Sequence, residues 1–416
     1  MAGTVKLLIV SQYFWPEDFR INELAHALRA RGHDVTVLTS IPNYPEGEVF
    51  PAYAEAPAAF ASFDGIEVIR APQLTRGNSK LHLIANYLSF AISASFLGPW
   101  RLRGRKFDAI FVFQTSPVTV GIPASLIAAL KRAPMLMWIL DCWPESLTSL
   151  GVVRGRVGKG LAGLLVRAIY ARCDLLLGQS QGFRQNVARY GKEARFRHFP
   201  NWVEAVYLRP LPLADRPAAD PFTILFAGNI GEAQDFPAIV AAAEQLRDSG
   251  IRFRIVGDGR DLARTHADVE ARDLAHMFDF AGRHPPSAMP DFFANADALL
   301  VSLKPEPIYG LTVPGKVQTY LAAGKPILAM LDGEGAEVVN AAGAGFAVPA
   351  GDSGALASAA LRMAVLPSSE LQAMGASGQA FARAHYDLGK LLEQLETWMV
   401  EARQQRSALK LPARDP

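Results

Sequence analysis

The sequence predicts an α/β protein built from two doubly wound, Rossmann-like domains. Short apolar runs recur along the chain with helical segments between them, and these runs are continuous rather than alternating. Strands of that kind are buried on both faces, as in a parallel sheet that helices cover. A proline-rich stretch near the middle of the 416 residues divides the runs into two series. Two such domains would face one cleft with their strand carboxyl ends, where ligands of these sheets bind.

The first series of strands defines a domain predicted over residues 1–200. Its strands are expected at Val5–Val10, Val35–Thr39, Ile66–Ile69, Ala109–Phe113, Met135–Leu140 and Leu175–Leu177. A first helix is expected at Ile21–Arg31, with Gly32 as its left-handed end. Five prolines between Pro200 and Pro221 interrupt regular structure, so residues 201–221 are predicted to be the hinge.

The second series defines a domain predicted over residues 222–385. Its strands are expected at Phe222–Ala227, Phe253–Val256, Phe278–Phe280, Ala298–Val301 and Ile327–Met330. Residues 386–416 are predicted to be a C-terminal helix and a polar tail that begins at Glu401. One helical stripe identifies this helix: Leu388, Leu391, Leu392, Leu395, Trp398 and Met399. The stripe suits packing on either domain, including a return to the first.

Composition and charge exclude several classes of protein. Two cysteines, Cys142 and Cys173, cannot build a disulfide scaffold and are expected to be reduced core thiols. The net charge of +2 argues against a nucleic-acid binder, yet residues 1–200 carry 23 Lys and Arg against 14 Asp and Glu. That basic half suits an anionic membrane leaflet or a phosphate-bearing acceptor. The run Met1–Ser11 resembles a buried strand more than a signal peptide, which favours the cytoplasm.

A glycine-containing turn in the second domain is the first candidate for a phosphate site. Gly228, Asn229 and Gly231 follow a strand and precede a helix, an arrangement in which exposed amides bind anions. The spacing is not the dinucleotide fingerprint G-x-G-x-x-G. Glycines that only form a tight turn explain the pattern equally well.

The segment Lys304–Pro326 is a more specific candidate, because it is an irregular loop leading into a helix expected from Pro314 to Gly324. The loop can aim backbone amides at a diphosphate, with Lys316 one turn into the helix and Glu306 accepting sugar hydroxyls. The amides in question belong to Leu311, Thr312 and Val313. Ordinary solvent-facing roles for Glu306 and Lys316 are the alternative.

Polar side chains after the strands of the first domain are candidates for acceptor binding. Asp141 follows the strand Met135–Leu140, where a carboxylate can orient or deprotonate a hydroxyl, or can cap a helix. The other candidates are Tyr13, Glu17, Arg20, Asn43, Tyr44 and Glu145. Arg20 suits an acceptor phosphate, with a surface ion pair as the alternative. His26 and His33 are expected to be structural, and no metal site is expected.

The stretch Leu81–Trp100 is mostly apolar and is followed by a basic segment, residues 101–106. Interspersed polar groups argue against a membrane span. Peripheral docking on anionic lipid through Arg101, Arg103, Arg105 and Lys106 fits better, with a buried helix as the alternative.

The order of short motifs along the chain carries a family resemblance. The motifs are Tyr13-Phe-Trp-Pro-Glu17, Gly32-His-Asp-Val-Thr-Val-Leu-Thr39, Phe199-Pro-Asn-Trp-Val203, Gly228, Val256-Gly-Asp-Gly259, Phe280-Ala-Gly-Arg283 and Tyr320-Leu-Ala-Ala-Gly-Lys-Pro326. In this order the chain resembles the family 4 retaining glycosyltransferases. It is most similar to their bacterial surface-polysaccharide branch, of the L-fucosamine transferase type.

The resemblance implies a GT-B fold, a nucleotide-sugar donor on the second domain, an acceptor on the first, and retention of the donor's anomeric configuration. It implies no metal or other cofactor, and the chain has no Asp-x-Asp pair. The chain departs from the family pattern at two positions, which changes the residues expected to contact the phosphates. Many members have an Arg where this chain has Asn229. Members usually also have a pair of glutamates, and here Glu306 matches the first whereas Thr319 stands in place of the second. Lys316 is then expected to do more, with Lys304 and Arg283 as helpers.

The function that the resemblance implies is transfer of a hexose or N-acetylhexosamine, with N-acetylfucosamine as first choice, from a UDP-sugar. The implied acceptor is a polyprenyl-diphosphate-linked saccharide for O-antigen or capsule synthesis at the cytoplasmic face of the inner membrane. A UDP-sugar 2-epimerase of the same fold is one alternative. A noncatalytic sugar-nucleotide-binding protein is another.

Overall fold

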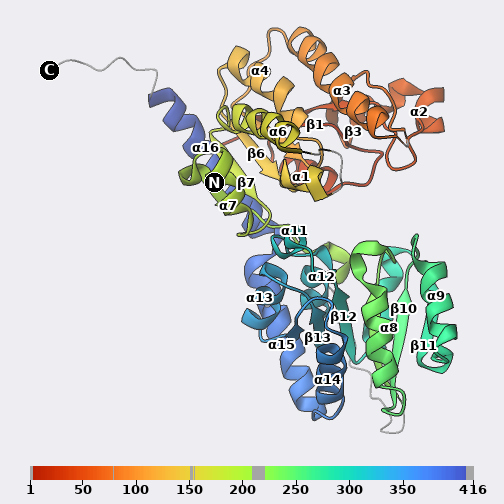
Figure 1. Cartoon of the computed structure of the whole chain (residues 1–416). Coiled ribbons are helices and arrows are strands. Elements are labelled where there is room, and N and C mark those ends of the chain that lie inside the picture. Colours follow the sequence, from red (N-terminus) through yellow and green to blue (C-terminus); the bar gives the residue numbers. More distant parts are fainter. Residues whose placement is uncertain (1–2, 78, 150–152, 154, 209–220, 409–416) are drawn as a thin grey trace. The chain divides into compact units, whose positions relative to one another are not determined.

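The computed structural model describes residues 3–77, 79–149, 153, 155–208 and 221–408, and these divide into two compact units (Figure 1). The N-terminal unit extends to Gln179 and also includes Phe183–Phe199 and the chain from Leu391 onward. The C-terminal unit consists of Ser180–Gly182 and Pro200–Lys390. Most of the predicted hinge, residues 201–221, lies outside the described residues.

The N-terminal unit is built on an eight-stranded sheet that is parallel except at the edge strand β3. In sheet order the strands are β3 (Ser62–Phe63), β4 (Ile66–Ala71), β2 (Asp34–Ser40), β1 (Lys6–Ser11), β5 (Ala109–Gln114), β6 (Met135–Ile139), β7 (Leu175–Gly178) and β8 (Phe196–His198). Strands β5 and β6 are buried along their whole length, as continuous apolar runs predict. The sequence did not predict β3 and β8, because neither contains an apolar run.

Helices cover both faces of this sheet. They are α1 (Arg20–Ala30), α2 (Pro51–Glu55), α3 (Lys80–Arg101), α4 (Gly121–Lys131), α5 (Glu145–Ser149), α6 (Gly155–Tyr170) and α7 (Phe183–Tyr190). Helices α3, α4 and α6 connect strands that advance toward β8, whereas α1 connects β1 to β2 in the opposite direction. Right-handed crossovers therefore place α1 on one face of the sheet and the other three helices on the opposite face.

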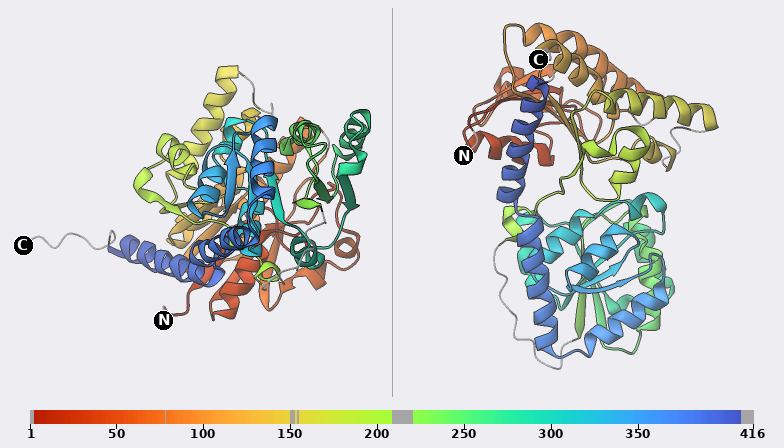
Figure 2. Two further views of the ribbon diagram at one scale, coloured as in Figure 1. Left: turned by 90° about the horizontal axis from the view of Figure 1, so that it is seen from below. Right: turned by 90° about the vertical axis from the view of Figure 1, so that its left-hand side faces the viewer.

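The C-terminal helix α16 (Leu388–Ala408) returns to the N-terminal unit. Its apolar stripe was compatible with packing on either domain, and the structure places it on the first. The Glu396 carboxylate is 2.6 Å from Nε of Arg31 and 2.9 Å from Nε2 of His33, both just after α1. The hydrogen bond from Arg31 is the main reason that the pKa of Glu396 lies below its usual value. Figure 2 shows α16, in dark blue, alongside the red and orange elements of this unit.

The predicted polar tail from Glu401 is partly helical, so that boundary was wrong. Helix α16 continues to Ala408, and its last turns are held by ion pairs from Arg403 to Asp108 and from Arg406 to Asp174. These partners lie far away in the sequence, and a local polar pattern does not reveal them.

The C-terminal unit is built on a six-stranded, fully parallel sheet. In sheet order the strands are β11 (Phe278–Gly282), β10 (Ile251–Val256), β9 (Phe222–Ala227), β12 (Ala298–Ser302), β13 (Ile327–Met330) and β14 (Gly345–Val348). Its helices are α8 (Phe236–Gln245), α9 (Leu262–Ala271), α10 (Met289–Ala294), α11 (Pro307–Gly310), α12 (Gly315–Ala323), α13 (Glu334–Ala341), α14 (Ser353–Ala364) and α15 (Ser368–His385). All five predicted strands are present, and β14 is an addition.

Candidate active site

Lys316 and Gly228 meet at the carboxyl end of β9, one of the two central strands of the C-terminal unit. Lys316 lies in the first turn of α12, and its ammonium is 3.5 Å from the centre of the Phe226 ring. A Cβ on Gly228, whose φ is +127°, would lie 2.8 Å from Cε of Lys316. Gly228 therefore leaves the space through which this ammonium reaches the edge of the sheet.

The Lys316 ammonium is buried and has no hydrogen-bond partner among the described residues. Burial lowers its pKa from the usual 10.5 to about 7. An aromatic ring attracts a buried cation but does not supply the hydrogen-bond acceptors that its N–H groups lose on leaving water. An anionic ligand would supply the missing partner.

Helix α12 begins where Lys316 lies, as the sequence predicted from Pro314 and Gly324. Its N-cap, Pro314, offers no side-chain hydrogen bond, and Gly324 ends the helix in the left-handed conformation. The amides of Gly315 and Lys316 belong to the first turn, whose N–H groups have no acceptor within a helix. These amides and the ammonium give one strand end a concentrated positive potential.

Of the three loop amides expected to bind a diphosphate, those of Leu311 and Thr312 already have acceptors within the protein, whereas the role of the Val313 amide stays a prediction. The Leu311 amide donates to the Ile308 carbonyl and the Thr312 amide donates to the Tyr309 carbonyl. Both bonds close the short helix α11, which the sequence did not predict. The amides at the start of α12 are better placed to bind an anion than those of the preceding loop.

Asn229 and Gly231 take the turn-forming role that the sequence left open. The Gly231 amide donates to Oε1 of Gln234, and Nδ2 of Asn229 lies 3.4 Å from the same oxygen. Gly231 is buried, whereas Asn229 is exposed. In this turn, Gly228 is the member that contacts Lys316.

Glu306 and Lys304 line a shallow depression together with Tyr309, Thr312 and Asp332. The Lys304 ammonium is paired with Glu232 at 2.9 Å, whereas the Glu306 side chain is exposed. Arg283 follows the edge strand β11, which β10 separates from β9. No contact among the described residues joins Arg283 to this group.

Tyr320 fixes α12 against β9, and the sequence analysis did not identify it as a site residue. Its buried hydroxyl accepts a 3.0 Å hydrogen bond from the Ala227 amide and lies 3.4 Å from the Ala227 carbonyl. Ala227 is the residue before Gly228. Tyr320 therefore positions the helix that carries Lys316.

We expect Tyr320→Phe to lower the free energy of unfolding of the C-terminal unit by about 1–2 kcal/mol, because the buried Ala227 amide loses its acceptor. Urea unfolding measures the change. Tyr309→Phe, which removes a hydroxyl from a half-buried tyrosine of α11, is the control and should leave the midpoint within experimental error. Equal stability of Tyr320→Phe and the wild type would contradict this role.

In the N-terminal unit, Glu17 and Asn43 connect the loops that follow β1 and β2. The Glu17 carboxylate accepts hydrogen bonds from the amides of Asn43 at 2.9 Å and Tyr44 at 2.8 Å. The Asn43 side chain accepts from the amide of Arg76 at 3.2 Å. Both Glu17 and Asn43 are buried. The sequence suggested that these two residues bind an acceptor. In the structure their polar atoms are used to position the loops.

Tyr13 and Tyr44 do lie together at this edge, with their ring centres 5.3 Å apart. The Tyr13 hydroxyl is buried without a hydrogen-bond partner among the described residues, and burial raises its pKa. The guanidinium of Arg76 lies 5.3 Å from the centre of the Tyr44 ring. Its positive charge also acts on Tyr13 and on Tyr87 of α3.

Asp141 follows β6 and is held by side chains. Its carboxylate accepts a hydrogen bond from Nε1 of Trp143 at 3.1 Å, and the nearby Ser116 and Ser146 hydroxyls favour its charged form. Burial nevertheless raises its pKa above the usual value. Helix α5 begins four residues later at Glu145, so Asp141 is not at its N-terminus and the helix-cap alternative is not supported. The catalytic role of Asp141 stays a prediction.

Two predicted acceptor residues have other partners. Arg20 forms an ion pair with Glu23 at 3.4 Å on its own helix, which is the alternative that the sequence allowed. Glu145 accepts a 2.8 Å hydrogen bond from Asn186 and a 3.3 Å hydrogen bond from Tyr190, both on α7. Glu145 therefore braces α7.

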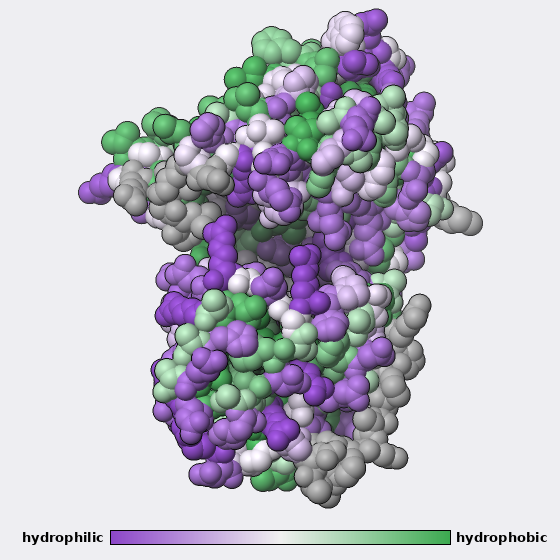
Figure 3. Space-filling model, turned by 90° about the vertical axis from the view of Figure 1, so that its right-hand side faces the viewer, coloured by the Kyte–Doolittle hydropathy of each residue, from purple (hydrophilic) through white to green (hydrophobic). Residues whose placement is uncertain are grey.

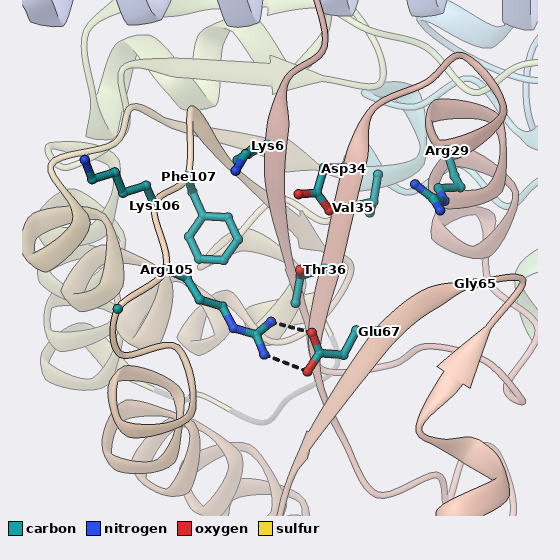
Figure 4. A pocket seen from close by; sticks show the side chains of 11 residues that line it. Lys6, Arg29, Asp34, Val35, Thr36, Gly65, Glu67, Arg105, Lys106 and Phe107 are labelled. Carbon is teal, nitrogen blue, oxygen red and sulfur yellow. Dashed lines mark hydrogen bonds and ion pairs between the residues drawn. The ribbon is translucent and has the colours of Figure 1, made fainter.

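A pocket of about 420 Å³ opens at the amino-terminal edge of the N-terminal sheet (Figure 4). Its walls are the first residues of β1 and β2 and the bidentate ion pair between Arg105 and Glu67. Lys6 and Asp34 project from those strand starts. Ligands of doubly wound sheets bind at carboxyl ends, so this pocket is not the active-site candidate.

No group of three His, Cys, Asp or Glu side chains suited to a metal ion occurs in the described residues. His33 accepts a hydrogen bond from the Val5 amide through Nδ1, and His26 pairs with Asp64. Cys142 and Cys173 are buried and free. These histidines and thiols serve the fold.

Two family models match the chain, one on each unit. Residues 19–202 match the model described as a glycosyl transferase 4-like domain. Residues 221–365 match the model described as glycosyl transferases group 1. Together the two matches contain Lys316, Asp141 and the loops around them.

Two curated proteins are similar over much of their length. WcaI of Escherichia coli strain K12, named as a colanic acid biosynthesis glycosyl transferase, is 28% identical over 338 residues, which cover 77% of this chain and 82% of WcaI. WbjE of Pseudomonas aeruginosa, named as a glycosyltransferase, is 28% identical over 271 residues, which cover 61% of this chain and 66% of WbjE.

Solved structures share the fold. Sucrose-phosphate synthase from Thermosynechococcus elongatus has a TM-score of 0.71 at 18% identity, with 98% of this chain and 100% of that chain covered. Anabaena HepE, solved in complex with UDP and glucose, has a TM-score of 0.66 at 15% identity, with 95% and 100% covered. The architecture is GT-B. The chain therefore carries a glycosyl transferase 4-like domain followed by a group 1 glycosyltransferase domain, and it belongs to the glycosyltransferases.

Proposed function

We propose that the protein transfers a sugar from a UDP-linked donor to a polyprenyl-diphosphate-linked saccharide and retains the donor's anomeric configuration. The observation that carries the donor half is the buried ammonium of Lys316, which has no hydrogen-bond partner in the part of the chain that the structure describes. It lies beside Gly228 and in the first turn of α12. A diphosphate supplies the negative charge that this site lacks. UDP is bound by the structural relative HepE, which supports the choice of nucleotide.

The chemistry at this site is charge stabilisation. As the sugar leaves, negative charge develops on the terminal phosphate of UDP. Lys316 and the amides of Gly315 and Lys316 are fixed before the reaction, so they stabilise that charge with little reorganisation. Glu306, exposed at the start of α11, accepts hydrogen bonds from hydroxyls of the donor sugar. Donor binding needs no metal ion in this proposal.

The acceptor half uses the carboxyl edge of the N-terminal sheet. Asp141 orients the attacking hydroxyl, and the departing phosphate takes its proton on the same face of the sugar. Arg76 replaces Arg20 as the proposed phosphate-binding residue. Its guanidinium lies on Tyr44 and forms no ion pair among the described residues. The buried hydroxyl of Tyr13, for which the described residues supply no hydrogen-bond partner, is close enough to feel the charge of Arg76.

We expect Arg76→Gln to raise the KM for a polyprenyl-diphosphate-linked acceptor by about tenfold or more, because one charge-assisted contact to phosphate is lost. The affinity for UDP should not change. Arg20→Gln is the matched control, since Arg20 already has Glu23 as its partner. If the two variants have the same KM, Arg76 does not bind the acceptor.

Incubation of the protein with radiolabelled UDP-sugars and lipid-linked acceptors, followed by lipid extraction, tests the function. Transfer of label to the lipid fraction, with the donor's anomeric configuration kept in the product, supports the proposal. N-acetylfucosamine is the first donor to try, and the curated name of WcaI points to surface polysaccharide. Interconversion of the UDP-sugar without transfer would instead identify a 2-epimerase. Binding without reaction would identify a noncatalytic protein.

A further inference from the structure

Large hydrophobic side chains are exposed along one stripe of α3. The stripe consists of Leu81, Ile84, Leu88, Ile92, Phe96 and Trp100, and Phe96 is 78% exposed. These residues recur every three or four positions, so they lie on one face of the helix. The opposite face, with Asn86, Phe90 and Ala94, is buried in the unit.

Helix α3 is long and apolar enough to cross a bilayer by composition, and one third of its apolar window is buried. Its buried face is tied to the domain, since the Asn86 side chain accepts a 2.9 Å hydrogen bond from Gln12. A helix held in this way cannot leave the domain to span a membrane. Its exposed stripe needs another apolar surface to cover it.

The two neighbouring helices continue the stripe. Helix α4 exposes Ile122, Leu126 and Leu130 at intervals of four, and α6 exposes Val157, Leu161 and Leu164. Helix α3 packs against α4, and α4 packs against α6, on the same face of the sheet. We call the exposed side chains of these three helices the apolar helix face. In the space-filling view, hydrophobic side chains gather over the top and upper left of this unit (Figure 3).

The three helices of the apolar helix face carry charges of one sign. Residues 80–101, 121–131 and 155–170 contain no Asp or Glu. Arg101 and Arg103 lie 5.2 Å from the centre of the Trp100 ring, and Arg156 and Lys159 are exposed on α6. A second copy of this chain would place basic groups against basic groups, which costs free energy. Anionic lipid complements the charges and covers the apolar side chains.

We propose that α3, α4 and α6 dock together on an anionic phospholipid bilayer, with their apolar helix face embedded at the interface. This surface is larger than the one predicted from residues 81–106, because α4 and α6 also take part. Arg105 is no longer included, because it forms an ion pair with Glu67. The proposal does not depend on the identity of the donor or on catalysis.

Sedimentation with vesicles tests the proposal, using phosphatidylcholine alone and an equal mixture of phosphatidylcholine and phosphatidylglycerol. The wild type should bind the mixed vesicles. Phe96→Ser/Leu126→Ser/Leu161→Ser, with one change per helix, should reduce the partition coefficient at least about tenfold. Arg101→Gln/Arg103→Gln should reduce binding to mixed vesicles roughly 30-fold and change little with phosphatidylcholine alone.

The matched control is Leu208→Ser/Leu361→Ser/Val365→Ser, which removes three exposed hydrophobic side chains from the C-terminal unit. It should bind vesicles like the wild type. Thermal unfolding checks that every variant is folded. Failure of the wild type to sediment, or equal loss in the two triple variants, would overturn the proposal. So would a wild type that dimerises through this face and loses the dimer in the first triple variant.

Discussion

UDP should bind at least about 30-fold more weakly to Lys316→Ala than to the wild type. Removing one partner of a desolvated charge pair costs about 2 kcal/mol or more, which is roughly 30-fold in affinity. The Lys316 ammonium lacks a partner among the described residues, so diphosphate would be its principal counter-charge. Titration calorimetry measures the affinity. Turnover should be nearly abolished as well, because the leaving phosphate loses the same stabilisation.

The pH dependence of UDP affinity is a second signature of Lys316. Its pKa in the unliganded protein is about 7, and a bound diphosphate favours the charged form. Wild-type affinity should therefore fall by up to about tenfold per pH unit above pH 7, with uptake of a proton on binding. Lys316→Ala should lose this dependence. A wild-type affinity that is flat from pH 7 to pH 9 would contradict the assignment.

Two control variants separate this effect from unfolding and from net charge. The pKa of Lys316 is about 7 in the folded protein and 10.5 in its ordinary state, so the unfolded chain binds more protons between these values. Its contribution to stability therefore decreases as pH falls from 10.5 to 7. Lys316→Met removes that cost and should be at least as stable as the wild type at pH 7.

Lys390→Ala removes an exposed lysine of the C-terminal unit and should leave UDP affinity unchanged.

The strand order along the chain and the position of α12 could be predicted because both depend on local patterns. Continuous apolar runs such as Phe222–Ala227 and Ile327–Met330 are strands with the predicted bounds. Gly324 ends α12 in the left-handed conformation that glycine favours. Lys316 follows from this start and end, since the first turn of that helix fixes its position.

The other site residues depend on contacts between distant segments. Arg76 and Tyr87 come from a loop and from an apolar helix, and only the sheet order brings them beside Tyr44. Glu17 looks like a ligand-binding acid in the sequence, yet it is occupied by amides 26 and 27 residues away. Sequence spacing does not show which polar groups the fold itself will use.

The Leu311 and Thr312 amides are also used by the fold itself, which the sequence did not reveal. A loop rich in proline and glycine gave no helical signal, but Pro307–Gly310 forms one helical turn that consumes both amides. The positive end of the site therefore moves to α12. The Asn229 departure from the family pattern supports the same shift, because Asn229 engages Gln234 in the turn.

Asp141→Asn should lower kcat by about a hundredfold or more while UDP affinity stays at the wild-type value. A neutral amide keeps the size of the side chain and an acceptor for Trp143, but it attracts the proton of an acceptor hydroxyl much less than a carboxylate does. Steady-state kinetics with a lipid-linked acceptor and UDP calorimetry measure the two quantities. Asp64→Asn, at an exposed acid of the same unit, is the control and should keep full activity.

The pH profile tells a charged role for Asp141 from a merely structural one. Burial raises the pKa of this carboxyl, so the acidic limb of the wild-type profile should lie above the usual range for aspartate. Activity should be lost as the pH falls through that raised pKa, because the protonated acid no longer attracts the hydroxyl proton. Asp141→Asn should lack this limb at its low residual rate. If the variant keeps both the limb and the wild-type kcat, another group performs this step and Asp141 serves only to hold Trp143, Ser116 and Ser146 in place.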